Sequence, residues 1–536
     1  MPLQGSGGGP SEDNVTGLLV RSTAAKWARG SLLAVDAGSH MAAITRILEH
    51  DMPLVAQHDA PAPVAQPERP LTSDGSSLPS SPMTRETPPP PPSPIVLKNG
   101  PFAGLPLPNA SARANAAYIV RSHVSTYLIT HPHLDHLSAF AINTASFHAT
   151  SRPKRLAALP FTVDAIKRHI FNDVIWPNMT DEDGGVGFVT FQRLKEGGDV
   201  MVGEGEGRGY IEVCEGLGVK GFKISHGNCM RGAPAMQAQR SSVSNISDSY
   251  ISSGNTLDRR SISLSHLQAN GIDHGYSSPG AMAPQASFGN EPHHSTVVDS
   301  TVYFIRDCAT SKEVLIFGDV EPDSVSNSPR LSGIWHEAAT KIATGILTGM
   351  FIECSYDDSQ PDAVLFGHMA PRHIVAELQS LAELVQDEKM NRAQEKALRK
   401  RKRSSNTAGM PDSSSLNEAI EKRRNMGLTG ARTPTTPLRR SSISAALHEE
   451  KVPSPLTLSS QLKSVAFPPE PVVIGSPLDG VRIVIIHVKD TLKDGPHISE
   501  RILRQLNDHA TLLEEAGWGR LGCEFIVSES GKDYYF

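Results

Sequence analysis

Short apolar runs alternate with stretches of helical apolar spacing along much of the chain. The runs 32–36 (LLAVD) and 124–130 (VSTYLIT) are apolar on both faces, which is typical of strands buried inside a protein. The same pattern predicts further strands over 16–21, 220–225, 302–306, 314–317, 350–353, 363–366 and 481–487. Apolar residues at helical spacing predict helices over 41–50, 164–175, 373–385 and 500–515.

Strands that interleave with helices predict the α/β class, with sheets covered by helices. Three long stretches interrupt this pattern, at about 55–108, 231–300 and 387–471. They are rich in Pro, Ser, Gly, Asn and Thr, and the third opens with a charged helical segment. Such compositions bury too little apolar surface to offset chain entropy, so we expect disordered inserts there.

The charge balance excludes a partner held by bulk electrostatic attraction. Lys and Arg number 51 against 57 Asp and Glu, a net charge of −6, so neither nucleic acid nor a membrane is an expected partner. The only dense basic run, 399–403 (RKRKR), is a candidate nuclear import signal or a solvated charge run. Five cysteines without a CxxC pair indicate reduced thiols and a cytoplasmic, or also nuclear, location.

The beginning of the chain bears on two motifs, a secretory signal and a phosphate-binding loop. It has neither a charged nor an apolar signal region, so no secretory signal is expected. The glycine-rich run at 5–9 lacks the Lys and Ser/Thr of a phosphate-binding loop, and we interpret it as a tight turn.

The densest chemical motif follows the run VSTYLIT and reads His131-Pro-His133-Leu-Asp135-His136. Three imidazoles and a carboxylate within six residues are preferred ligands for Zn²⁺ and similar metals. His131 and His133 alternate along an extended turn and can bind one ion, whereas Asp135 and His136 can reach a second. The alternative, a polar loop with chance histidines, does not explain so dense a pattern.

A site for two metals needs more ligands, and three later strand ends offer them. His226 follows KGFKIS, Asp319 follows VLIFG and His487 follows VRIVII. A lone histidine at a strand end is more often a structural residue. The recurrence of such residues downstream of the first motif favours metal ligands.

Several blocks resemble the metallo-β-lactamase superfamily and, more closely, the class II 3′,5′-cyclic nucleotide phosphodiesterases of the low-affinity fungal type. These blocks are HPHLDHLSAFAINTA (131–145), GGPSEDNVTGLLVRS, LLAVDAGSH, IFGDVEPD, MFIECSYDDSQPDAVLFGHMAP and VIIHVKD. The resemblance implies an αββα sandwich, with residues 1–536 forming a single metallo-hydrolase domain interrupted by the inserts. It also implies hydrolysis of 3′,5′-cyclic nucleotides (cAMP, with cGMP left open) to nucleoside 5′-monophosphates by a di-metal-activated hydroxide, which would lower cyclic nucleotide signalling.

The resemblance further implies two divalent metal ions, with zinc favoured by the imidazole-rich ligands. One ion would be held by three histidines, the second by two histidines and an aspartate, and one aspartate would bridge them: His131, His133 and His226; Asp135, His136 and His487; Asp319.

Four more residues, and Asp135 a second time, receive implied or candidate roles. Asp36 would orient ligands from outside the ligand set, unless it only caps a helix. His368 would contact the phosphate or protonate the leaving oxygen, unless it is structural, and Glu353 would set its tautomer. Asp135 would also accept a proton from the attacking water. Ser442, after two arginines, resembles the acceptor of a basophilic kinase and is a candidate phosphosite.

Two other functions share these residues. A nuclease of the tRNA 3′-processing type would use the same metals but needs a basic track for the phosphate backbone. A non-catalytic binding protein of the same fold would have lost its metals. The oligomeric state stays open.

Overall fold

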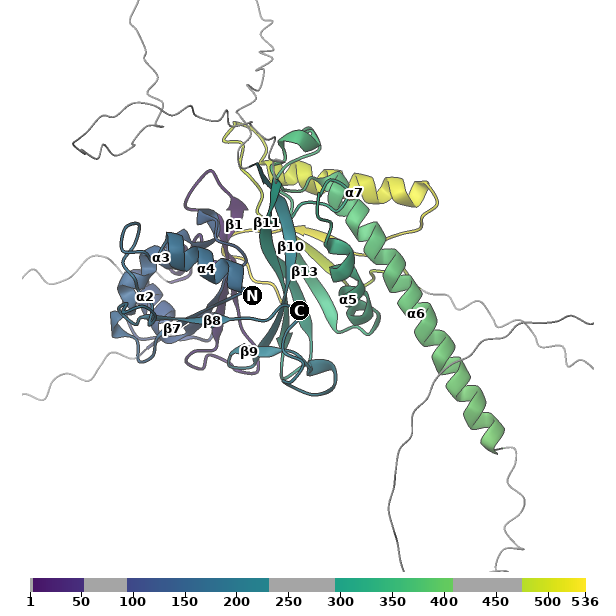
Figure 1. Cartoon of the computed structure of the whole chain (residues 1–536), viewed down its shortest axis with the longest axis horizontal. Helices are drawn as coiled ribbons and strands as arrows, with labels where there is room; N and C mark the ends of the chain where they lie inside the picture. Colours follow the sequence, from purple (N-terminus) through teal and green to yellow (C-terminus); the bar gives the residue numbers. More distant parts are fainter. Residues whose placement is uncertain (1–2, 53–93, 231–294, 408–474) are drawn as a thin grey trace, which may run out of the picture.

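Two β-sheets lie face to face between outer layers of helices (Figure 1). The computed structural model describes residues 3–52, 94–230, 295–407 and 475–536. Among these residues, no helix combines the length and the apolarity that are needed to cross a bilayer. The two sheets between two layers of helices confirm the predicted αββα sandwich of the metallo-β-lactamase type.

The first sheet has the strand order β1-β2-β3-β6-β7-β8. Its first three strands are antiparallel, and those from β3 onward are parallel. Its strands are β1 (Leu3–Gly8), β2 (Val15–Val20), β3 (Leu32–Val35), β6 (Val124–Leu128), β7 (Lys154–Ala158) and β8 (Val189–Arg193). The helices on its outer face are α1 (Met41–Asp51), α2 (Ala112–Ser122), α3 (Leu134–Asn143) and α4 (Pro160–His169).

The second sheet has the order β15-β14-β13-β12-β11-β10-β9, parallel from β12 to β15 and antiparallel beyond. Its strands are β9 (Ile211–Cys214), β10 (Leu217–Met230), β11 (Ser295–Asp307), β12 (Glu313–Phe317), β13 (Leu347–Glu353), β14 (Arg482–Ile486) and β15 (Glu524–Val527). Its outer face is covered by α5 (Leu331–Ala343), α6 (Pro371–Thr407) and α7 (Ile498–Glu515). Smaller elements are β4 (Ile95–Val96), β5 (Pro106–Leu107), η1 (Thr144–Ala149), η2 (Gly205–Gly207) and η3 (Asp362–Val364).

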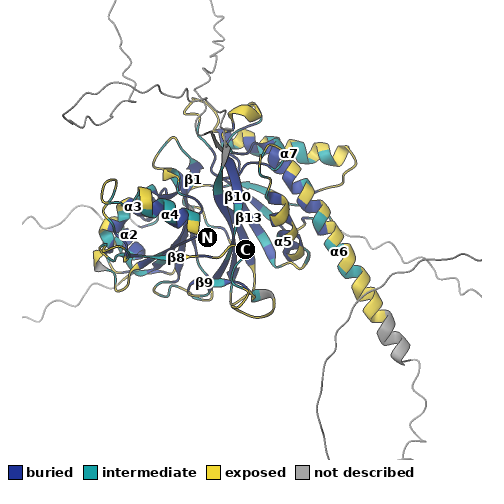
Figure 2. Cartoon of the chain, in the orientation of Figure 1, coloured by how far each residue is buried: buried dark blue, intermediate teal, exposed yellow. Residues whose placement is uncertain are grey.

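Successive side chains of each strand point to opposite faces of its sheet, so they pack into separate layers of the core. Leu18 and Val20 of β2 face the second sheet, whereas Leu19 between them faces the helices. Tyr303 and Phe351 of the second sheet pack into the same layer between the sheets. Both faces of the central strands are buried (Figure 2), which explains their continuous apolar runs.

Two predicted elements differ from the structure. The run 363–366 is not a strand, because it forms η3 and a turn that leaves Phe366 74% exposed. Four apolar residues have no periodicity that separates a strand from a turn. The helix predicted over 164–175 is α4, which begins earlier, at Pro160, and ends at His169. The Asn172 side chain then accepts hydrogen bonds from the backbone of Val174 and Ile175, which stabilises a turn instead.

The insert boundaries also differ from the prediction. Residues 94–107, placed in the first insert, form β4 and β5 and bury Phe102 and Leu105. Helix α6 continues through the charged stretch as far as Thr407 and extends away from the sandwich (Figure 1). Residues 295–300, placed in the second insert, form the start of β11. Apart from residue 108, the other parts of the three predicted inserts lie outside the described residues, and the single-domain organisation stays a prediction.

The glycine-rich run is a strand rather than the expected turn. It forms β1, which pairs with β2, and its backbone also bonds to the second sheet: Gly8 N donates to Val488 O at 3.0 Å and His487 N donates to Ser6 O at 2.8 Å. A Cβ atom on Gly8 would lie 2.7 Å from the His487 ring. Glycine is needed here so that the backbone can approach an imidazole closely.

A buried polar chain holds β1, the turn before α1 and β6 together. His40 Nδ1 lies 2.9 Å from Gln4 Oε1, and His40 Nε2 lies 2.9 Å from the Tyr127 hydroxyl. We predict that Tyr127→Phe lowers the free energy of unfolding by about 1–3 kcal/mol, because one end of a buried imidazole loses its partner. Urea unfolding followed by tryptophan fluorescence measures this change. Tyr118→Phe, which removes the hydroxyl of a half-buried tyrosine on α2, is the matched control, and equal stability of the two variants would contradict the prediction.

Candidate metal centre

The carboxyl ends of parallel strands from both sheets meet at one edge of the sandwich. In the first sheet, Asp36 follows β3 and His131 follows β6. In the second sheet, Asp319 follows β12, Glu353 ends β13 and His487 follows β14. Parallel neighbours end at the same edge of a sheet, so residues distant in sequence become neighbours in space.

The motif at 131–136 spans the connection from β6 to α3. His133 immediately precedes α3, and Asp135 and His136 lie in its first turn. A carboxylate in the first turn complements the helix dipole, so this motif also favours the start of the helix. His226 comes from β10, at a register shift between Ser225 and Asn228. Such a bulge redirects a side chain out of the regular alternation.

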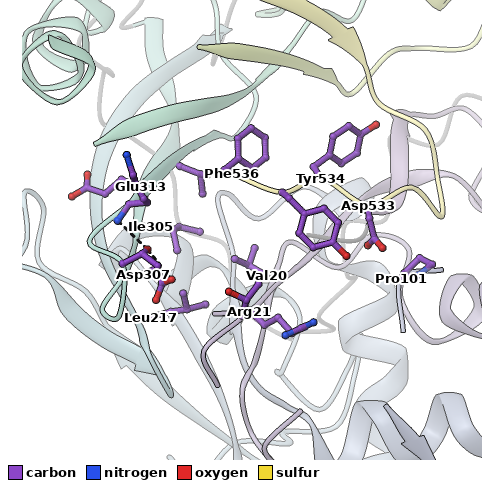
Figure 3. Close-up of a pocket in the computed structure, with 15 residues that line it drawn as sticks. Val20, Arg21, Pro101, Leu217, Ile305, Asp307, Glu313, Asp533, Tyr534 and Phe536 are labelled. Atoms are coloured by element: carbon purple, nitrogen blue, oxygen red, sulfur yellow. Dashed lines mark hydrogen bonds between the residues drawn. The ribbon is translucent and has the colours of Figure 1, made fainter. Parts of the chain in front are cut away.

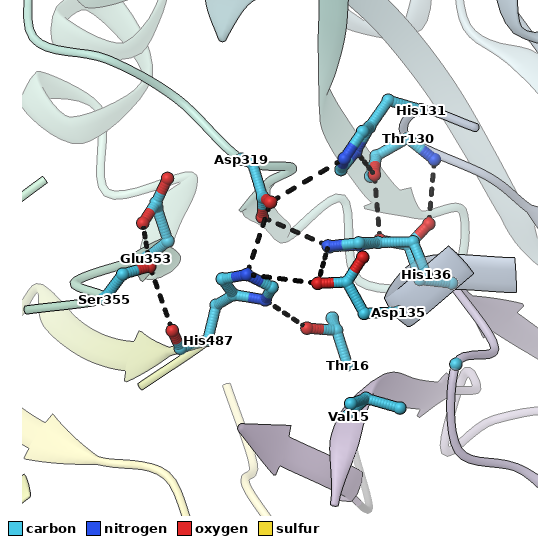
Figure 4. A network of polar contacts seen from close by, with 12 residues as sticks. Val15, Thr16, Thr130, His131, Asp135, His136, Asp319, Glu353, Ser355 and His487 are labelled. Carbon is cyan, nitrogen blue, oxygen red and sulfur yellow. Dashed lines mark hydrogen bonds and ion pairs between the residues drawn. The ribbon is translucent and has the colours of Figure 1, made fainter. Parts of the chain in front are cut away.

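Imidazoles surround the carboxylate of Asp319, and Figure 4 shows three of them: His131, His136 and His487. The carboxylate is 2% exposed. It lies 3.2 Å from His136 Nε2 and 3.3 Å from His487 Nε2. It lies 3.6 Å from His226 Nε2 and 3.7 Å from His131 Nε2. His133 completes the cluster, with its ring centroid 4.5 Å from that of His131.

The Nδ1 atoms of four of these imidazoles, those of His131, His136, His226 and His487, have hydrogen-bond partners within the protein. The Thr130 hydroxyl donates to Asp36 Oδ2 at 2.9 Å, so its oxygen accepts from His131 Nδ1, 3.0 Å away. Asp36 Oδ2 also accepts from His136 Nδ1 at 2.8 Å. The Thr16 hydroxyl lies 2.8 Å from His487 Nδ1.

His226 follows the same rule, because its Nδ1 donates to the backbone oxygen of Gly367 at 2.9 Å. Occupied Nδ1 atoms leave the Nε2 lone pairs directed at the centre. The Nε2 atoms of His131, His136 and His487 are buried, and none makes a hydrogen bond within the described part of the chain. Buried nitrogens without partners, aimed at one carboxylate, fit a metal ion as their missing partner.

Electrostatics favour the neutral, ligating form of every imidazole in this cluster except His136. Burial lowers the pKa of His131 and of His487 well below the usual value, and that of His133 to about 4. Burial opposes charge on His136 as well, but Asp319 and Asp36 raise its pKa well above the usual value. Burial would raise the pKa of Asp319, but His136 and His487 hold it well below the usual range. Asp319 therefore stays ionised, and most of the imidazoles stay neutral.

All seven residues predicted as metal ligands lie in two groups whose candidate ligand atoms are within 4.8 Å of one another. The groups share Asp319: His131, His133, His226 and Asp319; Asp135, His136, His487 and Asp319. This grouping coincides with the division suggested by the sequence. The assignment of these residues as ligands stays a prediction.

His368 and Glu353 lie beside this centre. Glu353 Oε1 accepts from His368 Nδ1 at 2.9 Å and from the backbone nitrogen of Val320 at 2.8 Å. Burial lowers the pKa of His368, but the Glu353 carboxylate outweighs burial and raises it overall. The His368 ring stacks on that of His487 with centroids 5.4 Å apart. His226, Glu353 and His368 form a third group of candidate ligands.

Asp36 is close to the cluster but turned away from its centre. Besides its contacts with Thr130 Oγ1 and His136, it accepts from the backbone nitrogen of Thr130 at 2.8 Å. Burial raises its pKa. This position agrees with an orienting role, which also stays a prediction. Ser442 lies outside the described residues.

Sequence reasoning missed the hydroxyl groups that fix the imidazoles. Thr130 directly precedes His131, so its place at the strand end was a usable signal. Thr16 carries no such signal, because its contact with His487 joins residues 471 positions apart. Ser355 donates to Glu353 Oε2 at 2.6 Å, and its hydroxyl lies 3.1 Å from His487 O, which joins the ends of two neighbouring strands (Figure 4).

Comparisons with known proteins agree with this geometry. A 3′,5′-cyclic-nucleotide phosphodiesterase of Schizosaccharomyces pombe is 28% identical over 273 residues, which are 51% of this chain and 56% of the relative. A 3′,5′-cyclic-nucleotide phosphodiesterase 1 of Saccharomyces cerevisiae is 26% identical over 51% of this chain and 54% of the relative. This chain thus spans little more than half the length of either relative.

The crystal structure of unliganded yeast PDE1 matches the fold with a TM-score of 0.51 and 18% identity. The match covers 98% of this chain and 96% of that structure.

The family of class-II cAMP phosphodiesterases matches residues 103–264 and 281–394, just over half of the chain. The matched range contains the motif at 131–136 together with Asp319, Glu353 and His368. The chain therefore belongs to the class-II cAMP phosphodiesterase family.

Proposed function

We propose that the chain hydrolyses 3′,5′-cyclic nucleotides, with cAMP as the first candidate substrate, to nucleoside 5′-monophosphates. The observation that carries this proposal is the buried cluster of imidazoles whose Nε2 atoms converge on Asp319. Family membership supports the cyclic nucleotide as the substrate class. Removal of this messenger would lower cyclic nucleotide signalling.

The ligand set fits two divalent ions, and Asp319, which belongs to both groups, would hold both. His131, His133 and His226 would hold one ion, and Asp135, His136 and His487 the other. Imidazole nitrogens with few carboxylates favour zinc. When bound, such ions acidify water toward neutral pH and neutralise the charge of a phosphodiester.

Side chains of the protein would transfer the protons of this reaction. Asp135 is 31% exposed and belongs to the second group, so its carboxylate is accessible to accept the proton that the attacking water loses. The water oxygen bonds to phosphorus while the bond from phosphorus to the 3′-oxygen breaks. Asp36 and the hydroxyls of Thr16 and Thr130 keep the imidazoles oriented throughout.

His368 would give a proton to the departing 3′-oxygen. Glu353 binds its Nδ1, which leaves Nε2 as the atom that faces a substrate. Glu353 is itself fixed by Val320 and Ser355, so the imidazole is held in one orientation. A fixed acid beside the leaving oxygen contributes about 10²–10⁴-fold to the rate.

A substrate panel tests this function. We expect the purified full chain to hydrolyse cAMP to 5′-AMP, and to lose this activity with a chelator and regain it with Zn²⁺. Cyclic GMP, a 2′,3′-cyclic nucleotide and a tRNA precursor are assayed in parallel by chromatography of the products. Cleavage of the tRNA precursor alone would favour the nuclease, and no cleavage of any substrate by metal-loaded protein would favour a binding protein.

Removal of one predicted ligand should abolish activity without unfolding the chain. His133→Ala is the best choice because His133 lies at the exposed start of α3. We expect kcat/KM to fall by more than about 100-fold, beyond the usual effect of a supporting residue, and the bound metal to decrease. Mass spectrometry of the metals and the circular dichroism spectrum check this result. His336→Ala, an exposed histidine on α5, is the control, and full activity of His133→Ala would refute the ligand assignment.

His368→Ala separates an acid from a metal ligand. We expect kcat to fall by about 10²–10⁴-fold while the metal content equals that of the unsubstituted protein. Steady-state kinetics and metal analysis of the same preparation measure both quantities. Loss of metal would instead make His368 a ligand, in line with the third ligand group.

A further inference from the structure

Lys489 is a cationic residue beside the candidate metal centre. It lies two residues after His487, and its side chain is half-buried. Its Nζ lies 5.5 Å from the centroid of the Tyr356 ring, and that ring lies 6.1 Å from the ring of His368. Contacts therefore lead from Lys489 through Tyr356 to His368, whose ring stacks on that of His487.

Backbone contacts fix this arrangement. Lys489 N donates to Ser355 O at 3.1 Å. This bond joins the segment after β13, which carries Tyr356, to the segment after β14, which carries Lys489. Helix α7 also holds the segment after Tyr356: Arg501 pairs with Asp357 at 2.7 Å and His509 lies 2.6 Å from Asp358.

Lys489 differs from two other partly covered lysines that pair with carboxylates. Lys341 pairs with Glu313 at 3.1 Å and Lys167 pairs with Glu182 at 2.7 Å. Among the described residues, no carboxylate forms a salt bridge with Lys489. The adjacent Asp490 instead accepts from the backbone nitrogen of Leu492 at 2.9 Å.

The backbone places Lys489 two residues after His487, beside the candidate metal centre. A cation without a carboxylate partner, held beside a cluster that fits metal ions, is suited to an anionic ligand. A phosphodiester carries such a charge.

We infer that the Lys489 ammonium binds a phosphoryl oxygen of the substrate, with Tyr356 supporting the lysine side chain. In naming the phosphodiester as the ligand, this inference rests on the proposed function. Inorganic phosphate has the same anionic oxygens and serves as a probe that does not depend on hydrolysis. The competing account is a cation–π contact that only stabilises the loop.

The experiment compares Lys489→Met with Lys489→Arg in the metal-loaded full chain. Methionine keeps the length and apolar stem of the side chain but removes the charge, and arginine restores the charge. Lys493→Met, four residues further along in an exposed position, removes the same charge from the same loop and is the matched control. Calorimetry gives the Kd for inorganic phosphate, kinetics give kcat/KM for cAMP, and mass spectrometry gives the metal content.

We expect Lys489→Met to raise the Kd for phosphate and lower kcat/KM by about 10- to 100-fold, the usual effect of losing a charged hydrogen bond. Metal content should not change, Lys489→Arg should recover most of the loss, and Lys493→Met should match the unsubstituted protein. A phosphate Kd within twofold of that protein would overturn the inference, and so would a loss of metal, because Lys489 would then act through His487.

These results separate the two proposals. If no variant hydrolyses a cyclic nucleotide but Lys489→Met still weakens phosphate binding, the proposed function fails and the anion site stands. If cAMP is hydrolysed and the phosphate Kd does not change, the function stands and the role of Lys489 is refuted.

Discussion

The burial of one carboxylate among imidazoles is the constraint on which the rest of the structure depends. An ionised group that leaves water loses several kcal/mol of solvation, so Asp319 is stable at 2% exposure only while cationic or ligating groups surround it. Those groups come from both halves of the sandwich. His131 and His136 belong to the β6–α3 connection, whereas His226 and His487 belong to the second sheet. The packing of the two sheets and the assembly of the centre therefore depend on each other.

Hydrogen bonds from outside the cluster decide which nitrogen of each imidazole faces inward. Asp36, Thr130 and Thr16 bind the Nδ1 atoms, and so does the backbone oxygen of Gly367. Each partner lies on a strand end or in a tight turn, where packing limits its movement. Such an arrangement is preorganised, because little rotamer freedom remains to be lost when a ligand binds. The close approach of Gly8 to His487 serves the same purpose through backbone shape.

The local field at this edge differs from the field of the whole molecule. The chain carries a net charge of −6, which repels an anionic substrate at long range. Near the centre, Lys489 and the metal ions that the ligand set fits would reverse that sign over a few ångströms. Charge of this kind acts mainly after the substrate has entered, where solvent screening is weak. The loop that carries Tyr356 is tied to α7 by Asp357 and Asp358, so the positive side of the centre is also structurally rigid.

The sequence by itself determined the features that depend only on residues close together along the chain. Buried strands appear as apolar runs, the motif at 131–136 contains four candidate ligands within one turn, and polar residues end the strands that carry Asp319 and His487. Tertiary structure alone decided the features that depend on distant neighbours. The glycine-rich run is a strand because it pairs with β2, and residues 94–107 are ordered because Phe102 and Leu105 have a core to enter. The contact of Thr16 with His487 and that of Lys489 with Tyr356 likewise depend on residues that are distant in the sequence. A pattern along the chain reports which faces need burial, but which groups then meet is fixed only by the packing of one sheet against the other.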